Sequence, residues 1–176
     1  MMAVAAEARH SRLERMLARL AVQKACLEFA CSELSASRGV ILELGLGKGR
    51  TYDHLRKLFP AREIYVFDQT LHAPRDCVPD SRHLRLGDLR ETLADPILVA
   101  LDVILVHADI GSEDLASDAR LTLELAPLID KLVSGGALVL SDREMKVARW
   151  QALPLPGAAD DWRYFMYRVG ESPASR

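Results

Sequence analysis

The spacing of apolar residues divides the chain into a helical start followed by alternating strands and helices. Over residues 4–36, apolar side chains recur at intervals of three, four and seven, with charged residues opposite them, which predicts one long amphipathic helix or two in series. The pattern beyond this point predicts strands at 40–42, 63–67, 83–86, 101–106 and 137–140, and helices at 50–59, 89–93 and 115–132. Such alternation is typical of an α/β fold with a parallel sheet.

The end of the chain has a different pattern. Residues 163–169 alternate in character as a strand does, and residues 147–153 form another apolar run before the turn-forming stretch 157–161. These features predict an antiparallel hairpin. Gly135 and Gly136 are expected to end the preceding helix.

A glycine-rich turn separates the first strand from the next helix. Gly45, Gly47 and Gly49 leave the backbone free to take positive φ and to let a ligand approach its N–H groups. A strand, a glycine turn and a helix in this order form a nucleotide-type binding site. A dinucleotide site would need glycine in place of Arg50, and a phosphate-binding loop would need Ser or Thr directly after Lys48. Both of these alternatives are therefore disfavoured, including an NAD(P)-linked oxidoreductase.

The second predicted strand stops at Asp68. An acidic side chain at this strand end can accept hydrogen bonds from both hydroxyls of a ribose. Asp68 therefore favours an adenosyl ligand independently of the glycines.

Glu43 followed by Gly-x-Gly-x-Gly, together with Asp68, resembles the class I S-adenosylmethionine-dependent methyltransferases. The resemblance covers residues 39 to about 142 by motif. It implies a Rossmann-like sheet of seven mostly parallel strands in the order 3-2-1-4-5-7-6, with helices on both faces. It also implies S-adenosyl-L-methionine as cofactor and S-adenosyl-L-homocysteine as product. The cofactor contacts that it implies are Glu43, Leu44, Gly45, Gly47, Gly49, Arg50, Thr51, Asp68, Gln69, Thr70, Gly87, Asp88, Leu89, His107 and Asp109.

Three of these residues have a structural alternative. Asp88 and Asp109 each precede a predicted helix and could cap it, and Asp88 could do so while also bonding the adenine. His107 could simply end the fourth strand.

Polar residues at the ends of the fourth and fifth strands are the candidates for chemistry on the acceptor. His107 to Ile110 lacks the Asn/Asp-Pro-Pro-aromatic segment of enzymes that methylate nucleic acid bases. The ends of these two strands resemble more closely the metal-dependent catechol-type O-methyltransferases, which place Asp at the position of His107 and an Asp-Asn pair at Asp142-Arg143. Asp142 fits that pattern, whereas His107 and Arg143 depart from it. Histidine is a poor ligand for Mg²⁺, and Arg143 would repel a cation. We therefore expect a catalytic role for His107, as a base or as a hydrogen-bond donor to the substrate, and one for Asp142, and no metal.

Composition limits the class of protein. The 176 residues predict a single domain, with a helical segment at 1–38 packed on a cofactor-binding domain at 39–176. The net charge of -2, from 23 basic and 25 acidic residues, gives no field that favours nucleic acid or an anionic membrane. Cys26, Cys31 and Cys77 lack metal-type spacing, so reduced thiols in the cytoplasm are expected. The N-terminal region has no apolar run of signal or membrane length.

Together these features predict a cytoplasmic methyltransferase that uses S-adenosyl-L-methionine on a small-molecule acceptor. The segment after the fifth strand is so short that the usual inserted helix is short or missing. The substrate is then expected to be covered by the N-terminal helices, by the loop at 69–82 or by another subunit, as in a homodimer. A protein that holds the cofactor without transferring its methyl group is the alternative from a different class.

Overall fold

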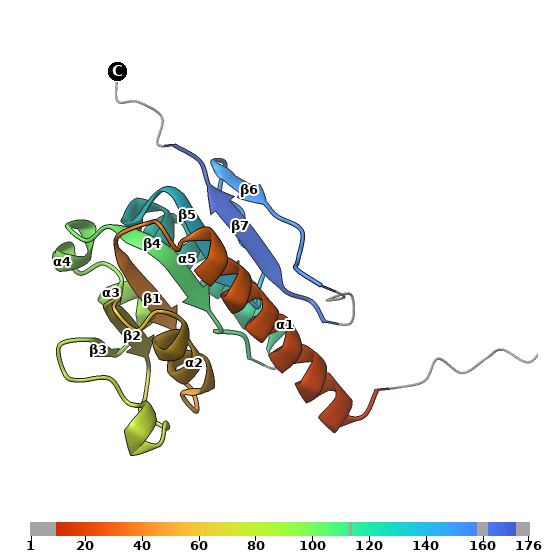
Figure 1. Cartoon of the computed structure of the whole chain (residues 1–176). Coiled ribbons are helices and arrows are strands. Elements are labelled where there is room, and N and C mark those ends of the chain that lie inside the picture. The colour runs from red at the N-terminus through yellow and green to blue at the C-terminus, as the bar shows by residue number, and fades with distance from the viewer. Residues whose placement is uncertain (1–9, 113, 158–161, 172–176) are drawn as a thin grey trace, which may run out of the picture.

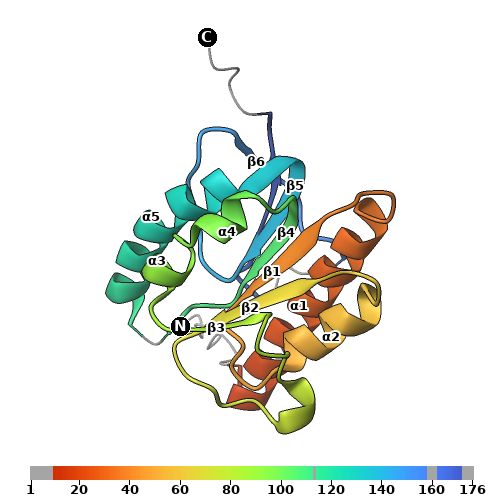
Figure 2. The ribbon, with the colours of Figure 1, turned by 90° about the vertical axis from the view of Figure 1, so that its left-hand side faces the viewer.

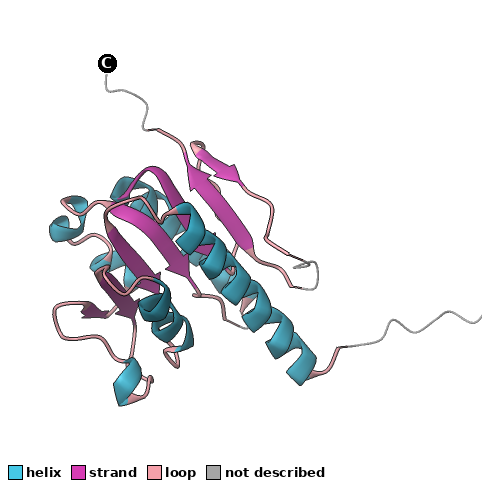
Figure 3. Cartoon of the chain, viewed as in Figure 1, coloured by secondary structure: helices cyan, strands magenta, loops and turns pink. Residues whose placement is uncertain are grey.

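A computed structural model describes residues 10–112, 114–157 and 162–171. Its strands form one seven-stranded sheet in the order β3-β2-β1-β4-β5-β7-β6. The strands from β1 to β5 pair in parallel, while β7 runs antiparallel to both β5 and β6. The predicted fold class, strand order and terminal hairpin are confirmed (Figures 1 and 3). Residues 158–161 of the predicted hairpin turn lie outside the described residues.

The strands are β1 Val40–Leu44, β2 Ile64–Asp68, β3 Leu84–Leu86, β4 Val103–Ala108, β5 Val133–Ser141, β6 Trp150–Ala152 and β7 Phe165–Val169. The helices are α1 Arg12–Glu33, α2 Arg50–Leu58, α3 Leu89–Thr92, α4 Pro96–Val99 and α5 Leu115–Leu132, with a 3-10 turn at Arg75–Cys77. Figure 2 shows α1 and α2 on one side of the sheet and α3, α4 and α5 on the other. The sheet is therefore the middle layer of three.

Two central strands run further than predicted. β1 continues to Leu44 and β4 to Ala108, so Glu43 and His107 lie within strands. These two residues are register partners in the parallel pairing of β1 with β4. Because each satisfies the other through a side-chain hydrogen bond, the sheet can continue through two buried polar positions.

Gly135 and Gly136 do not cap the preceding helix, so that prediction was wrong. α5 ends at Leu132 and β5 begins directly at Val133, with both glycines inside the strand. Gly136 has φ of 84°, and the register between β4 and β5 shifts near this point. A glycine with positive φ allows such an irregularity in a strand. The short helix α4 was not predicted, although Asp95 caps it and Pro96 begins it.

Helix α1 starts with a capping box between Ser11 and Glu14 and ends at Glu33, short of the predicted residue 36. Residues 4–9 of the predicted helix lie outside the described part of the chain. The second half of α1 packs on the sheet, whereas Leu13, Met16 and Leu17 in its first half are 68%, 42% and 59% exposed. In Figure 1 this first half runs beyond the sheet.

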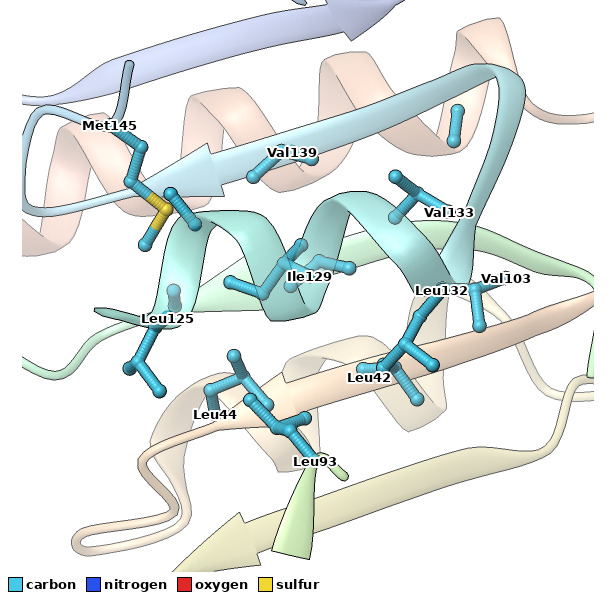
Figure 4. Packing of buried hydrophobic residues seen from close by; sticks show 14 of the residues in the cluster. Leu42, Leu44, Leu93, Val103, Leu125, Ile129, Leu132, Val133, Val139 and Met145 are labelled. Carbon is cyan, nitrogen blue, oxygen red and sulfur yellow. The ribbon is translucent and has the colours of Figure 1, made fainter. Parts of the chain in front are cut away.

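Helix α5 closes the opposite face. Its buried residues Leu125, Ile129 and Leu132 pack in one cluster with Leu42 and Val139 of the sheet (Figure 4). Both faces are thus covered, and the carboxyl ends of β1, β2 and β4 open toward the same edge, where ligands of such sheets bind. None of the helices in the described ranges combines the length and apolarity that a membrane span requires.

Candidate cofactor and acceptor site

The glycine turn between β1 and α2 has positive φ at each of its three glycines, with 91° at Gly45, 51° at Gly47 and 76° at Gly49. A Cβ at Gly45 would lie 2.3 Å from the carbonyl oxygen of Asp109, and one at Gly49 would lie 2.5 Å from Cβ of Cys77. These two glycines are needed for packing. A Cβ at Gly47 would meet nothing within 4 Å. Gly47 therefore borders open space at the cavity.

An open cavity of about 640 Å³ lies over this turn. It is lined by Met16, Arg19, Leu20, Gln23, Gly45, Leu46, Gly47, Lys48, Arg50, Thr51, Asp68, Gln69, Thr70, Leu89, Arg90, Asp109, Ile110, Gly111, Ser112, Ser117, Asp118 and Leu121. The volume is within the range of small-molecule sites, roughly 300–1,000 Å³. The walls come from α1, the glycine turn, the end of β2, the segment after β4 and the start of α5.

Asp68 fixes the cofactor side of this cavity. It is the last residue of β2, and its Oδ2 accepts a hydrogen bond from the Gly47 N–H at 2.9 Å. Its Oδ1 accepts a longer bond of 3.4 Å from the N–H of Thr70. The carboxylate thus joins the glycine turn to the loop after β2 and lies at the cavity wall, which fits the recognition of a ribose.

The cavity unites most of the predicted cofactor contacts. Those that line it are Gly45, Gly47, Arg50, Thr51, Asp68, Gln69, Thr70, Leu89 and Asp109, whereas Glu43, Leu44, Gly49, Gly87, Asp88 and His107 do not. Asp142, predicted as a catalytic residue, does not line it either. Glu43, Leu44 and His107 are fully buried in their strands. Asp88 accepts a hydrogen bond from the Arg90 N–H and so caps α3, which is one of the two roles expected for it.

Glu43 and His107 form a buried pair beneath the cavity. Nδ1 of His107 and Oε2 of Glu43 are 2.6 Å apart, and neither side chain is exposed. The other oxygen of Glu43 accepts a hydrogen bond from Thr51, which does line the cavity. Burial, the largest influence, lowers the pKa of His107, but the charge and hydrogen bond of Glu43, with the charges of Asp109 and Asp142, raise it above its usual value.

Asp142 supports the cavity wall. Its carboxylate accepts hydrogen bonds from the N–H groups of Ile110 at 3.1 Å and Gly111 at 2.9 Å, and Arg143 pairs with it at 3.2 Å. Burial and the charge of Asp109 raise its pKa. Because Arg143 already neutralises Asp142, this strand end is a poor cation site. The described residues contain no group of three or more His, Cys, Asp or Glu side chains that could hold a metal.

The wall opposite the glycine turn contains residues that the sequence motifs did not predict. Arg19, Leu20 and Gln23 of α1 line the cavity, and Arg19 pairs with Asp109 at 2.6 Å. The periodicity of the sequence predicted that α1 packs on the sheet. The same pattern does not show which residues of the inward face contact the core and which line a cavity. Leu121 on α5 is a similar case.

The chain matches the family described as S-adenosyl-L-methionine methyltransferase over residues 10–169. The structure of an S-adenosyl-L-methionine methyl transferase from Silicibacter pomeroyi DSS-3 is 39% identical, with coverage of 92% of this chain and 100% of that one and a TM-score of 0.85. Human methyltransferase-like protein 13 in complex with SAH is 11% identical, with coverage of 91% and 84% and a TM-score of 0.52, and shares the fold. No curated protein sequence matches the chain.

The room at Gly47 and the carboxylate of Asp68 fit the cofactor that this family uses. The family uses S-adenosyl-L-methionine, the cofactor that the sequence predicted in preference to NAD(P). With a match over residues 10–169 and a 39% identical relative that is covered over its whole length, the chain belongs to the S-adenosyl-L-methionine methyltransferase family, whose reaction is methyl transfer from that cofactor.

Proposed function

We propose that the protein is an active, metal-independent methyltransferase whose acceptor is a small molecule. The observation that carries this proposal is the cavity of about 640 Å³ over the glycine turn. It joins the glycine turn and Asp68 to a second region formed by α1, the segment after β4 and the start of α5. Because both regions are within one partly enclosed space, a cofactor and a small acceptor can meet there, whereas an exposed macromolecular surface is not required.

Bound cofactor supplies an electrophilic methyl group, and this chain's residues supply the positioning. Asp68 would hold the ribose, and the backbone of the turn around Gly47 would lie against the cofactor. Asp142 is a positioning residue in this scheme, because it holds the N–H groups of Ile110 and Gly111 and so fixes the wall beside the acceptor. Orientation of this kind supplies much of the rate of a displacement reaction.

A homodimer in the cytoplasm is the assembly that we propose. Leu13 and Leu17 are exposed on the half of α1 that borders the cavity, and a second copy would cover them. Cys26, Cys31 and Cys77 are all free thiols, which supports a reducing compartment. Sedimentation at several protein concentrations tests the dimer. A monomer at every concentration would contradict it.

The function is tested by measuring S-adenosyl-L-homocysteine release from S-adenosyl-L-methionine in separate panels of small molecules, peptides and nucleic acids. We expect turnover in the small-molecule panel only, and unchanged turnover in EDTA. Activity that EDTA abolishes and Mg²⁺ or Mn²⁺ restores would overturn the metal-independent assignment. Tight binding of S-adenosyl-L-homocysteine without turnover in any panel would favour the cofactor-binding alternative. Asp68→Ala is the matched control and should need a higher concentration of S-adenosyl-L-methionine for the same turnover.

A further inference from the structure

The first half of α1 carries three arginines on one side of the helix. Arg12, Arg15 and Arg19 are spaced three and four residues apart, so they are neighbours on the helix surface. Arg19 lines the cavity, and so does Met16, which lies one turn after Arg12. Arg12 and Arg15 therefore continue the cavity-lining side of α1 by one further turn, about 6 Å, toward the end of the helix that runs beyond the sheet (Figure 1).

The same side of the helix packs on the sheet further along the chain. Ala30 follows Arg12 by 18 residues, which is five turns, and Cys26 follows Arg15 by 11 residues, which is about three turns. Both Ala30 and Cys26 are fully buried. An amphipathic helix usually places its charged residues opposite its buried face. Here the arginines take the place of apolar residues on the inward face, where the helix passes the edge of the sheet.

Arg12 and Arg15 do not stabilise the helix that carries them. Arg12 is the first residue of α1, where the helix dipole disfavours a cation, and like charges one turn apart repel each other. The acidic residue between them in the sequence, Glu14, is held in the capping box. Of the three arginines, only Arg19 forms an ion pair within the described ranges, and Arg12 and Arg15 are exposed. Two cations without a counterion on the inward face favour an anionic ligand.

The number and type of these groups favour a phosphate. A guanidinium presents a planar fork of N–H donors that matches the oxygens of a phosphate or a carboxylate. A phosphate monoester has three acceptor oxygens and a charge of about −1.5 to −2, so it can bind two guanidinium groups at once and balance both. A carboxylate carries one charge and balances one of them. Arg12 and Arg15 together therefore match a single phosphate group.

We propose that Arg12 and Arg15 bind a phosphate group of the acceptor at the mouth of the cavity, which makes the acceptor a small phosphorylated molecule. This inference rests on the proposed function. Arg19 lies one turn further along the same side of α1 and lines the cavity, so the rest of the acceptor extends past it toward the cofactor. Arg12 and Arg15 select the acceptor through a group that does not react, and no bond to phosphorus forms or breaks.

A stability comparison tests whether the two arginines serve a ligand and not the fold. The double variant Arg12→Gln/Arg15→Gln should leave the melting temperature of the free protein unchanged or raise it, because like charges are removed from the start of a helix. Arg149→Gln is the contrasting variant, since this guanidinium bonds the carboxylate of Asp130 and the carbonyl oxygen of Gly170. It should lower the melting temperature by about 3 °C or more. An equal fall in both would give Arg12 and Arg15 a structural role and overturn the proposal.

A binding comparison tests the ligand class. Phenyl phosphate and its neutral counterpart phenol are titrated at low ionic strength into the protein saturated with S-adenosyl-L-homocysteine, and binding is followed by NMR. We expect phenyl phosphate to bind about two- to thirtyfold more tightly than phenol, the range for two exposed ion pairs. The control Lys57→Gln/Arg120→Gln, which removes two exposed charges that do not line the cavity, should keep this preference. Arg12→Gln/Arg15→Gln should lose it, with the affinity for S-adenosyl-L-homocysteine unchanged.

Other results would assign the arginines differently. A preference for phenyl phosphate that is absent, or that survives Arg12→Gln/Arg15→Gln, would overturn the phosphate site, and benzoate bound as tightly as phenyl phosphate would overturn the choice of phosphate. Weaker binding of S-adenosyl-L-homocysteine in the double variant would assign the arginines to the cofactor's own carboxylate and overturn the proposal as well.

Two further results concern the kind of ligand and the protein's function. An RNA oligonucleotide or phosphatidylglycerol vesicles that bind more tightly than phenyl phosphate at physiological ionic strength, and lose this binding in the double variant, would replace the small acceptor by a polyanionic surface. Wild-type protein that fails to bind S-adenosyl-L-homocysteine at all would instead contradict the proposed function.

Discussion

At the scale of single residues, Asp68 is the side chain on which cofactor affinity should depend most. Its carboxylate accepts the Gly47 N–H at 2.9 Å and lines the cavity. Asp68→Ala should weaken binding of S-adenosyl-L-homocysteine by about 1.5–3 kcal/mol, or roughly tenfold to a hundredfold, since it removes a charged hydrogen-bond acceptor. Calorimetry measures the change, with Asp53→Ala on the exposed side of α2 as control. Equal affinity in wild type and Asp68→Ala would place the carboxylate outside the cofactor site.

A substitution at Gly47 has two effects that can be measured separately, the strain of a side chain at positive φ and the loss of space for the cofactor. Its φ of 51° means that any side chain is strained there, and a Cβ would project into open space. Gly136 in β5 has φ of 84° and also meets nothing within 4 Å, but it does not line the cavity. Alanine at either position should cost stability of about 1–2 kcal/mol. Only Gly47→Ala should also weaken the binding of the cofactor. Comparable affinity for S-adenosyl-L-homocysteine in both variants would show that the space at Gly47 is not used.

His107 predicts a pH dependence of stability. Its pKa is raised in the folded protein, against the opposing effect of burial, by Glu43, Asp109 and Asp142, and Tyr164 is the other titratable group beside it. A raised pKa contributes stability that is complete below the unfolded value of about 6.5 and is lost as pH rises through the folded value. NMR titration should therefore give a His107 pKa above 6.5.

Denaturant unfolding from pH 6 to pH 9 measures the consequence. The free energy of unfolding of the wild type should fall with rising pH more steeply than that of His107→Gln, which lacks the titrating ring. Parallel pH profiles would contradict the prediction.

At the scale of secondary structure, the sequence predicts where elements lie better than where they end. Apolar runs and alternation predicted all the strands of the sheet. Glu43 and His107, however, were interpreted as polar residues that follow a strand. Their pairing across β1 and β4 is a contact between distant segments, and only this contact allows the strands to continue. Gly135 and Gly136 were misassigned for a related reason, because a glycine pair after a helix is typical of a cap and only the register of β4 with β5 places it in a strand.

Helix α1 is held at the cavity by one ion pair near its middle. Arg19 and Asp109 have side chains that are 35% and 16% exposed, so their pairing should contribute about 0.4–1 kcal/mol. Arg19→Gln should make amide hydrogen exchange in the first half of α1 about two- to fivefold faster. Arg15→Gln, on an exposed position of the same helix, is the control. Unchanged exchange in Arg19→Gln would mean that packing alone fixes this half of α1.

At the scale of the whole molecule, the part of the cavity formed by the glycine turn and Asp68 was predictable from the sequence, and the opposite wall was not. The glycine turn and Asp68 belong to short contiguous motifs whose residue spacing is typical of strand ends. The opposite wall joins Gln23 and Leu121 from distant parts of the chain, and no local spacing relates them. The order of strands itself came from the resemblance to a family, since periodicity gives the elements but not their neighbours.

The packing of α1 on the sheet predicts that the chain folds as one unit. Val22, Cys26, Leu27 and Ala30 of α1 are buried in the cluster that covers this face of the sheet. Burial of an aliphatic side chain such as Val22 or Leu27 contributes about 1.5–3 kcal/mol, so together these residues supply a large part of a typical stability of about 5–15 kcal/mol. A chain that begins at residue 39 should therefore lose the cooperative thermal transition of the full chain and bind hydrophobic dyes.

A chain that begins at residue 10 is the matched control for this truncation, because it removes residues before α1 and keeps the helix. It should melt in one transition at the temperature of the full chain, as followed by circular dichroism and calorimetry. If the chain from residue 39 melts cooperatively within a few degrees of the full chain, residues 1–38 are an appendage to an independent domain. In that case the core would fold without α1 and would not fix the position of this helix. The cavity wall that Gln23 forms could then move independently of the rest of the site.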